Sequence, residues 1–350
     1  MNEPRYIEAP ETGNAFRRDY INSIEALLET RSRLAADRRT ERMAHIVAAP
    51  EEERATLARL LGWPLTEPRE AVRSVRRHFV AEDDGYRIYR MQFEIFENYF
   101  FYGILFLRDE ETPRPLVIAQ HGGQGTPESC SDMLGGSNNY RNMTRRLLAG
   151  DVNVFAPQLL LWNNARFLCR PQDEGLHMDA IRRPLDQRLK QVGTSIAALE
   201  IYSISCVLDY LEAQPFVDHD RLGMCGLSYG GFYALFCAAL DTRLRSTLSA
   251  AFFNDRRRYA WSDFVWEGSA DLFFDSEVAL LTYPRKLHIE VGADDPLFSS
   301  ESSAAEYARL RDFCAGGIGT DWLTYRAFEG RHEFPPDNGP IEALIRDLKE

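Results

Sequence analysis

The sequence of 350 residues has no apolar run long enough to span a membrane, no long block of Lys and Arg and no CxxC pair. A membrane-spanning helix needs about 20 consecutive apolar residues, and the first residues carry acids and prolines where a secretory signal needs an apolar stretch. The formal net charge of -12 repels phosphate backbones and anionic lipid surfaces. We therefore expect a soluble, cytoplasmic protein that binds neither nucleic acid nor membranes.

The cysteines also lack a spacing that would indicate disulfides or a metal site. Several have apolar neighbours, as in Met-Cys-Gly and Leu-Phe-Cys-Ala-Ala, and a free cysteine in such a setting behaves as a small buried apolar residue. We expect reduced thiols at the six positions Cys130, Cys169, Cys206, Cys225, Cys237 and Cys314. With 45% hydrophobic and 27% charged residues, the composition is typical of a compact globular protein.

Residues 1–75 are interpreted as an N-terminal helical extension. Between about residues 14 and 62, apolar residues recur at helical spacing among Ala, Leu, Glu and Arg. Pro50 is followed by three glutamates, which suit the first turn of a second helix. The sequence Gly62-Trp63-Pro64 then ends this helical unit.

Residues 76–350 are predicted to form one α/β domain. The segment from Val75 to Leu107 is rich in β-branched and aromatic residues, which is typical of antiparallel strands. Further on, apolar strand segments alternate with helices, which predicts an eight-stranded, mostly parallel sheet with helices on both faces. Two stretches, at about 161–192 and 254–283, are too long for simple connections, so we interpret them as lid insertions over the carboxyl edge of the sheet.

The most specific motif is Gly226-Leu227-Ser228-Tyr229-Gly230-Gly231, which follows an apolar strand and precedes an apolar helix. Strand, sharp turn and helix are the context of a nucleophile elbow, in which two glycines make room for a turn that exposes the serine. The alternative is a glycine-rich turn that contains a serine by coincidence. The flanking strand and helix favour Ser228 as a nucleophile.

A serine hydroxyl needs a base to take its proton and an acid to orient that base. In a fold with this elbow, the acid and then the histidine follow the serine along the chain. Only His288 and His332 come after Ser228. His288 lies inside an apolar strand, whereas His332 lies in a loop after the last strand, so His332 is the better candidate base.

The acid is expected in the loop after the strand at residues 286–291, where Asp294 and Asp295 are adjacent. Consecutive side chains of an extended loop point in different directions, so only one of the two carboxylates should reach the histidine. Spacing alone does not choose between them.

Acyl transfer also needs N–H donors for the developing oxyanion. One is expected from Tyr229, the residue after the nucleophile, and the other from the glycine-rich loop at residues 121–125, where we favour Gly123. Gln124, in the same loop, is a candidate substrate-binding residue. His121 is interpreted as structural, because it precedes Ser228 and a second base is not needed.

From about residue 85 to 345, the chain resembles the α/β-hydrolase superfamily, in particular the branch of dienelactone hydrolases, acetyl-xylan esterases and prolyl-oligopeptidase-like catalytic domains. The resemblance is carried by His121-Gly122-Gly123, by residues 217–231, by residues 292–297 and by Gly330-Arg331-His332. The acid of this branch stands in a Gly-x-x-Asp frame, which implies Asp295 rather than Asp294. The resemblance also implies a mechanism without metal or cofactor. It does not extend to the first 75 residues, which show no β-propeller pattern.

Aromatic residues in the insertions suggest walls of a substrate pocket. Trp162 follows a strand end where members of the family place pocket walls, and Trp261 and Trp266 lie in the second insertion. Aromatic walls suit an acyl group or a sugar ring. The alternative is that these tryptophans only pack the insertions onto the sheet.

The predicted function is hydrolysis of a small-molecule carboxylic ester, of a small acyl group or a carbohydrate, through an acyl-serine intermediate. The alternative is a peptidase or amidase that uses the same three residues. A non-catalytic ligand receptor on the same fold is a third interpretation, but such proteins typically lose a member of the triad. The sequence leaves open the acyl and alcohol parts of the substrate and whether the chain forms a homo-oligomer.

Overall fold

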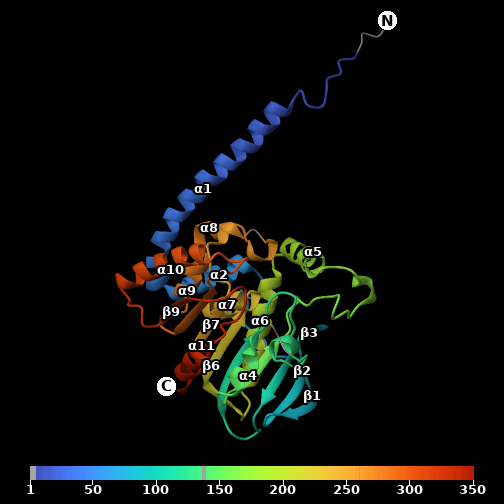
Figure 1. The fold of residues 1–350 in the computed structure, drawn as a ribbon, viewed down its shortest axis with the longest axis vertical. Helices are drawn as coiled ribbons and strands as arrows, with labels where there is room; N and C mark the ends of the chain where they lie inside the picture. The colour runs from blue at the N-terminus through green and yellow to red at the C-terminus, as the bar shows by residue number, and fades with distance from the viewer. Residues whose placement is uncertain (1–4, 136–138, 260) are drawn as a thin grey trace.

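The computed structural model describes residues 5–135, 139–259 and 261–350 (Figure 1). A sheet of nine strands runs through its centre in the order β1-β2-β3-β5-β4-β6-β7-β8-β9. The first three strands are antiparallel, and β3 also runs antiparallel to β5. The remaining six form a parallel sheet. The strands are β1 (Ser74–Asp83), β2 (Tyr86–Phe96), β3 (Tyr99–Leu107), β4 (Arg114–Gln120), β5 (Asn153–Pro157), β6 (Val217–Leu227), β7 (Leu244–Ala250), β8 (Lys286–Gly292) and β9 (Leu323–Phe328).

The mostly parallel sheet is as predicted, but the strand number differs by one. The aromatic segment that begins near Val75 contains three strands, because two tight turns divide it. Asp84 and Gly85 both have positive φ (52° and 76°), and Asn98 has a φ of 62°. Positive φ at both central residues is characteristic of two-residue hairpin turns. The sheet therefore has nine strands rather than eight.

Helices cover both faces of the sheet, and a buried apolar cluster lies on each face. One face is covered by α3 (Pro127–Cys130), α4 (Met143–Leu148) and α11 (Gly339–Lys349). The other is covered by α2 (Pro50–Leu61), α6 (Ile196–Glu212), α7 (Tyr229–Leu240), α9 (Asp275–Leu280) and α10 (Ser300–Ala315). Among the described residues, no helix combines the length and the apolar character that crossing a membrane requires.

The two long connections lie over the carboxyl ends of the parallel strands, above the sheet in Figure 1. The stretch at 161–192 contains a short 3-10 helix (Pro171–Asp173) and α5 (Met178–Gln191). The stretch at 254–283 contains two 3-10 helices, Arg256–Arg258 and Ser262–Phe264, followed by α8 (Ser269–Leu272) and α9. The two connections touch each other through α5 and the 3-10 helix at Ser262–Phe264.

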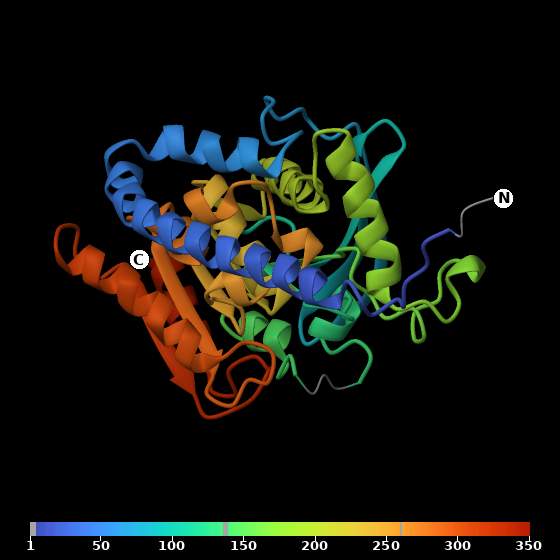
Figure 2. The same ribbon diagram turned by 90° about the horizontal axis from the view of Figure 1, so that it is seen from above.

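In the part of the chain that the structure describes, the first helix, α1 (Asn14–Ala48), has its buried residues in its C-terminal half. That half packs on α8 and α9, while the N-terminal half projects away from the body (Figure 1). Seen from above, the helix passes over the top of the molecule (Figure 2). The docked part is held by charge as well as by apolar contact. Arg39 Nε donates to Glu277 Oε2 at 2.8 Å, and Arg39 Nη2 donates to Glu306 Oε1 at 2.5 Å. All three side chains are almost fully buried. Arg309, which is partly exposed, also contacts Glu277.

Replacing Arg39 with methionine should lower the free energy of unfolding by about 3 kcal/mol, because Glu277 and Glu306 would remain buried without their central cation. Arg38→Met is the matched control, since the ion pair of Arg38 with Asp271 is substantially exposed and such pairs contribute less than about 1 kcal/mol. Urea denaturation followed by circular dichroism measures both changes. Equal losses in the two variants would contradict this account of how α1 is anchored.

Candidate active site

Ser228 lies at the sharp turn between β6 and α7. Its φ and ψ are 62° and −119°, a combination that is costly for a residue with a side chain and persists only where the surroundings impose it. The turn is held from below, because the Ser228 N–H donates to the carbonyl oxygen of Ala250 on the next strand at 2.8 Å. The serine side chain is thereby raised above the end of the sheet.

Two glycines make this turn possible. A Cβ atom at Gly226 would lie 2.3 Å from the carbonyl oxygen of Gly230, and one at Gly230 would lie 2.2 Å from that of Gln120. Both positions contact backbone, which cannot move aside as a flexible side chain could. The spacing of glycines around Ser228 that marked the motif in the sequence therefore corresponds to a real steric requirement.

His332 and Asp295 meet beside this serine. The His332 Nδ1 atom lies 2.8 Å from Asp295 Oδ2, while Asp295 Oδ1 accepts the backbone N–H groups of Leu297 and Phe298 at 2.7 and 3.0 Å. An ionised carboxylate only accepts hydrogen bonds, so Nδ1 carries the imidazole proton and Nε2 is free to act as a base. Asp295 is buried, whereas Asp294 is exposed. Of the two adjacent aspartates, Asp295 is therefore the one that contacts His332.

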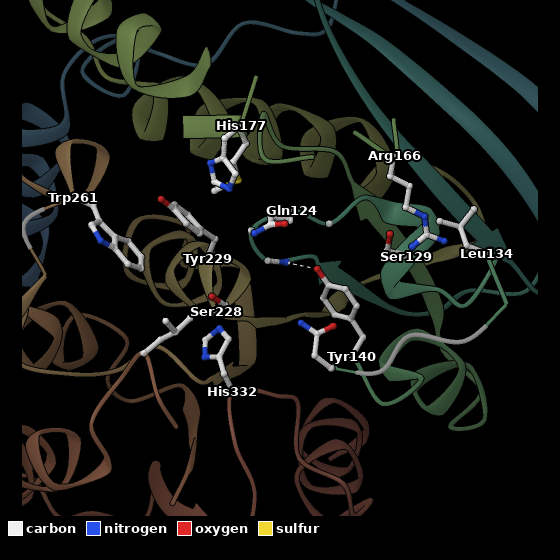
Figure 3. Close-up of a pocket in the computed structure, with 16 residues that line it drawn as sticks. Gln124, Ser129, Leu134, Tyr140, Arg166, His177, Ser228, Tyr229, Trp261 and His332 are labelled. Atoms are coloured by element: carbon white, nitrogen blue, oxygen red, sulfur yellow. Dashed lines mark hydrogen bonds between the residues drawn. The ribbon is translucent and has the colours of Figure 1, made fainter. Parts of the chain in front are cut away.

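Ser228 and His332 line one cavity of about 700 Å³ together with Gly123, Gln124 and Tyr229. In Figure 3 the imidazole lies next to the serine side chain. Asp295 does not line the cavity itself but contacts His332, which does. The structure thus brings the predicted nucleophile, base and acid together, along with both predicted oxyanion residues.

The predicted oxyanion groups occupy suitable backbone positions. Tyr229 is the first residue of α7, and the first N–H groups of a helix have no acceptor within the helix. The loop that carries Gly123 approaches the elbow closely, since a Cβ atom at Gly122 would lie 2.7 Å from the Leu227 carbonyl oxygen. The Gly122 N–H in turn donates to the hydroxyl oxygen of Tyr140 at 2.9 Å (Figure 3).

The three tryptophans of the insertions occupy three different environments. Trp162 lines a neighbouring pocket rather than this cavity, and its backbone pairs with that of Gln124. Trp261 does line the cavity and stacks on Tyr229 with a centroid distance of 5.8 Å. Trp266 is buried in the apolar core.

The other two histidines discussed above have structural contacts. His121 is fully buried, and this burial lowers its pKa to about 4, so the ring is neutral. Its Nδ1–H donates to the Gly122 carbonyl oxygen, and Nε2 accepts the Leu159 N–H. His288 joins β8 to α11 through a 2.7 Å contact with Asp347. Neither ring lines the cavity of Ser228.

Several cavity residues were not predicted, among them Tyr140, Arg166 and His177. Arg166 and His177 come from the irregular part of the 161–192 stretch, before α5, where no helix or strand periodicity indicates the direction of a side chain. Their only signal in the sequence was their position in a connection expected to cover the site. No group of three or more His, Cys, Asp or Glu side chains suited to hold a metal ion occurs in the described part of the chain.

A buried arginine joins the two long connections behind the cavity. Arg182 of α5 donates to Asp263 at 2.6 Å, to Glu200 at 3.0 and 3.1 Å and to the Tyr233 hydroxyl at 2.7 Å. Burial alone lowers the pKa of Arg182, but its ion pairs raise that pKa well above the ordinary value. Tyr229 is connected to the same network, because its hydroxyl donates to Asp263 at 3.3 Å.

Comparisons with known proteins agree with this architecture. A family model described as the prolyl oligopeptidase family matches residues 200–274. No curated protein matches the chain at a significant level of sequence similarity.

Several solved structures share the fold. A glucuronoyl esterase from Solibacter usitatus has 16% identity and a TM-score of 0.59, with 87% of this chain and 92% of that one covered. Acetyl xylan esterase 1 from Thermoanaerobacterium sp. has 14% identity and a TM-score of 0.53, with coverages of 85% and 93%. A Bacteroides fragilis protein assigned as an acetyl xylan esterase has 14% identity and a TM-score of 0.59, with coverages of 81% and 78%. The chain has the α/β-hydrolase fold, which confirms the predicted fold class.

Replacing Arg182 with methionine should loosen both long connections at once, because Asp263 and Glu200 would lose their buried cation. We expect limited proteolysis within residues 161–192 and 254–283 to become faster on the order of tenfold or more, since cleavage follows the population of locally opened states. Arg183→Met is the matched control, because Arg183 is exposed and its ion pair with Asp179 lies on the helix surface. An unchanged cleavage rate in the Arg182 variant would contradict a joining role.

Proposed function

We propose that this chain is a serine hydrolase that cleaves a carboxylic ester. The observation that carries the proposal is the arrangement of Ser228 in a strained turn next to His332, whose second nitrogen is held by the buried carboxylate of Asp295. Such a constellation activates a serine for nucleophilic attack. The esterases among the structures of the same fold support this class of substrate.

The first half of the reaction acylates the serine. Ser228 Oγ attacks the ester carbonyl carbon while His332 Nε2 takes the hydroxyl proton, and the carbonyl electrons move onto the oxygen. The backbone N–H groups of Gly123 and Tyr229 donate to that oxyanion. The intermediate then collapses, the bond to the alcohol oxygen breaks, and His332 returns the proton to the departing alcohol.

The second half releases the acid. His332 takes a proton from water, whose oxygen attacks the acyl carbon, and the bond to Ser228 Oγ breaks as the proton returns to the serine. Asp295 keeps the imidazole in the tautomer that both steps require and stabilises the imidazolium between them. The mechanism uses only groups of the chain and water.

A second candidate is a peptidase or amidase with the same three residues, favoured by the match of the prolyl oligopeptidase family model to residues 200–274. The chemistry of the triad suits both reactions, which differ in the group that leaves. The third interpretation, a non-catalytic receptor, is disfavoured because Ser228, His332 and Asp295 are all present and in position.

We also propose that the reaction takes place in the cytoplasm. All six cysteines are free and five of them are buried. Free thiols persist where glutathione and thioredoxin keep the compartment reducing.

A fluorophosphonate probe should label the folded wild-type protein but not Ser228→Ala, because the probe reacts with an activated serine. Hydrolysis of p-nitrophenyl acetate should also exceed that of p-nitroacetanilide, the amide of the same acyl group. Mass spectrometry of the labelled protein and release of the chromophores measure the two outcomes. Absence of labelling would support the receptor interpretation, and more efficient cleavage of the amide would support the peptidase.

Asp295→Asn should lower kcat by about 10²- to 10⁴-fold, because an amide in place of the carboxylate stabilises the wrong tautomer of His332. Asp294→Asn should lower kcat by less than about tenfold, as expected for an exposed side chain. Circular dichroism must show that both variants are folded. The reverse order of losses would transfer the orienting role to Asp294.

A further inference from the structure

The cavity around Ser228 differs in charge from the molecule as a whole. The chain has 53 acidic and 41 basic residues, yet none of the described residues that line the cavity is an aspartate or a glutamate. Its lining does include Arg166, His177 and His332. A concave site lined by one sign of charge attracts ligands of the opposite sign.

Arg166 is fixed relative to the oxyanion loop by a hydrogen-bonded turn. The Asn163 side-chain amide donates to Gln124 Oε1 at 3.1 Å, and Gln124 is the residue after Gly123. The Arg166 N–H donates to the Asn163 carbonyl oxygen at 3.1 Å, and the Ala165 N–H donates to Asn163 Oδ1 at 3.0 Å. The position of Arg166 is therefore coupled through Asn163 to the catalytic machinery.

The guanidinium of Arg166 is not neutralised by the protein. Throughout the described residues it forms no ion pair with a carboxylate; its recorded side-chain contact is the Phe167 ring, at 5.3 Å. Arg170, four residues further on in the same connection, is by contrast held by Asp173 at 2.6 and 2.8 Å. An arginine without a carboxylate at a cavity wall has five donors available for a ligand.

The cavity has two chemically different ends. Figure 3 shows Arg166 and Ser129 at one end and Trp261 at the other, with Ser228 and His332 in the part between them. The stacked rings of Trp261 and Tyr229 offer an apolar surface. An ester bound at Ser228 would thus direct one part toward aromatic rings and the other part toward a cation.

We propose that the substrate is an ester that also carries a free carboxylate, and that Arg166 binds this carboxylate. The proposal rests on the serine-hydrolase function proposed above and specifies its substrate class. A planar guanidinium can donate two parallel hydrogen bonds to one carboxylate. Arg166 therefore favours a ligand whose carboxylate lies at the correct distance from the ester group. Arg166 is therefore a specificity-determining residue, and the substrate is a monoester of a dicarboxylic acid or an ester of a hydroxy acid.

The test uses matched ester pairs that differ by one carboxylate. The first pair, the p-nitrophenyl monoester of adipic acid and p-nitrophenyl hexanoate, varies the acyl part. The second pair, 4-acetoxybenzoate and phenyl acetate, varies the alcohol part. The measured quantity is kcat/KM for the charged ester divided by kcat/KM for the neutral ester. For one of the two pairs, Arg166→Gln should lower this ratio on the order of ten- to hundredfold, because a charge-assisted bidentate contact is lost.

Arg188→Gln is the matched control. Arg188 is an exposed arginine on α5, in the same connection as Arg166, and does not line the cavity. Its replacement makes the same change in net charge, so a general electrostatic effect would appear in both variants. We expect the ratio to be unchanged in Arg188→Gln.

A binding measurement separates this proposal from the proposed catalysis. In a Ser228→Ala background, titration calorimetry with the same esters measures affinity without turnover, and Arg166→Gln should remove the preference for the charged member. Turnover of neutral esters with no effect of Arg166→Gln on either ratio would overturn the carboxylate site and leave the hydrolase intact. Charge-selective binding that depends on Arg166, with no turnover of any ester, would support the site and overturn the hydrolase. Absence of any preference in both measurements would overturn the site.

Discussion

The candidate active site depends on the close approach of backbone segments at the end of β6. Gly226 and Gly230 leave no space for a Cβ atom, and this absence of side chains allows β6 to turn directly into α7. The residue at the turn must then adopt a left-handed backbone conformation, which Ser228 does at an energetic cost. Displacement of this turn would separate the serine from His332, and Tyr229, with its N–H group, would move with it.

The walls of the cavity are held by a different kind of interaction. The turn at Ser228 is determined by the steric fit of backbone segments. The two long connections are instead held by buried ion pairs. Arg182 is surrounded by Asp263 and Glu200, and Arg39 is surrounded by Glu277 and Glu306. Because buried charges are costly without a partner, these groups define one arrangement of the connections. Arg166 differs from these arginines, because it lines the cavity and forms no ion pair with a carboxylate among the described residues.

The sequence predicted those features that depend on local geometry. The glycines around Ser228 and the strand before it identify the elbow, because the steric requirement involves residues close in the chain. The choice between Asp294 and Asp295 could not be made from spacing, because it depends on how the loop turns. In the structure Asp295 Oδ1 accepts the N–H groups of residues 297 and 298, and this contact turns its other oxygen toward His332.

Features that depend on distant contacts were not predicted, or were predicted incorrectly. Trp162 was predicted as a substrate-binding residue; it lines a pocket next to the cavity, and its backbone pairs with that of Gln124, far away in the sequence, a contact that the sequence alone does not reveal. The ninth strand was missed because the turn at Asp84-Gly85 lies within a segment that is otherwise continuously strand-like. Arg166 and His177 lie in the irregular segment before α5, where the sequence has no periodicity, so their positions became clear only in the folded structure.

The network of Arg182 has a consequence for how this architecture can diversify. One guanidinium is shared by a carboxylate from the second connection and by one from α6, while the arginine itself belongs to the first connection. Replacing either connection by that of another protein would leave a buried charge without its counterpart. The two connections therefore depend on each other for stability. Grafting experiments that aim to transfer specificity onto this scaffold must exchange them together.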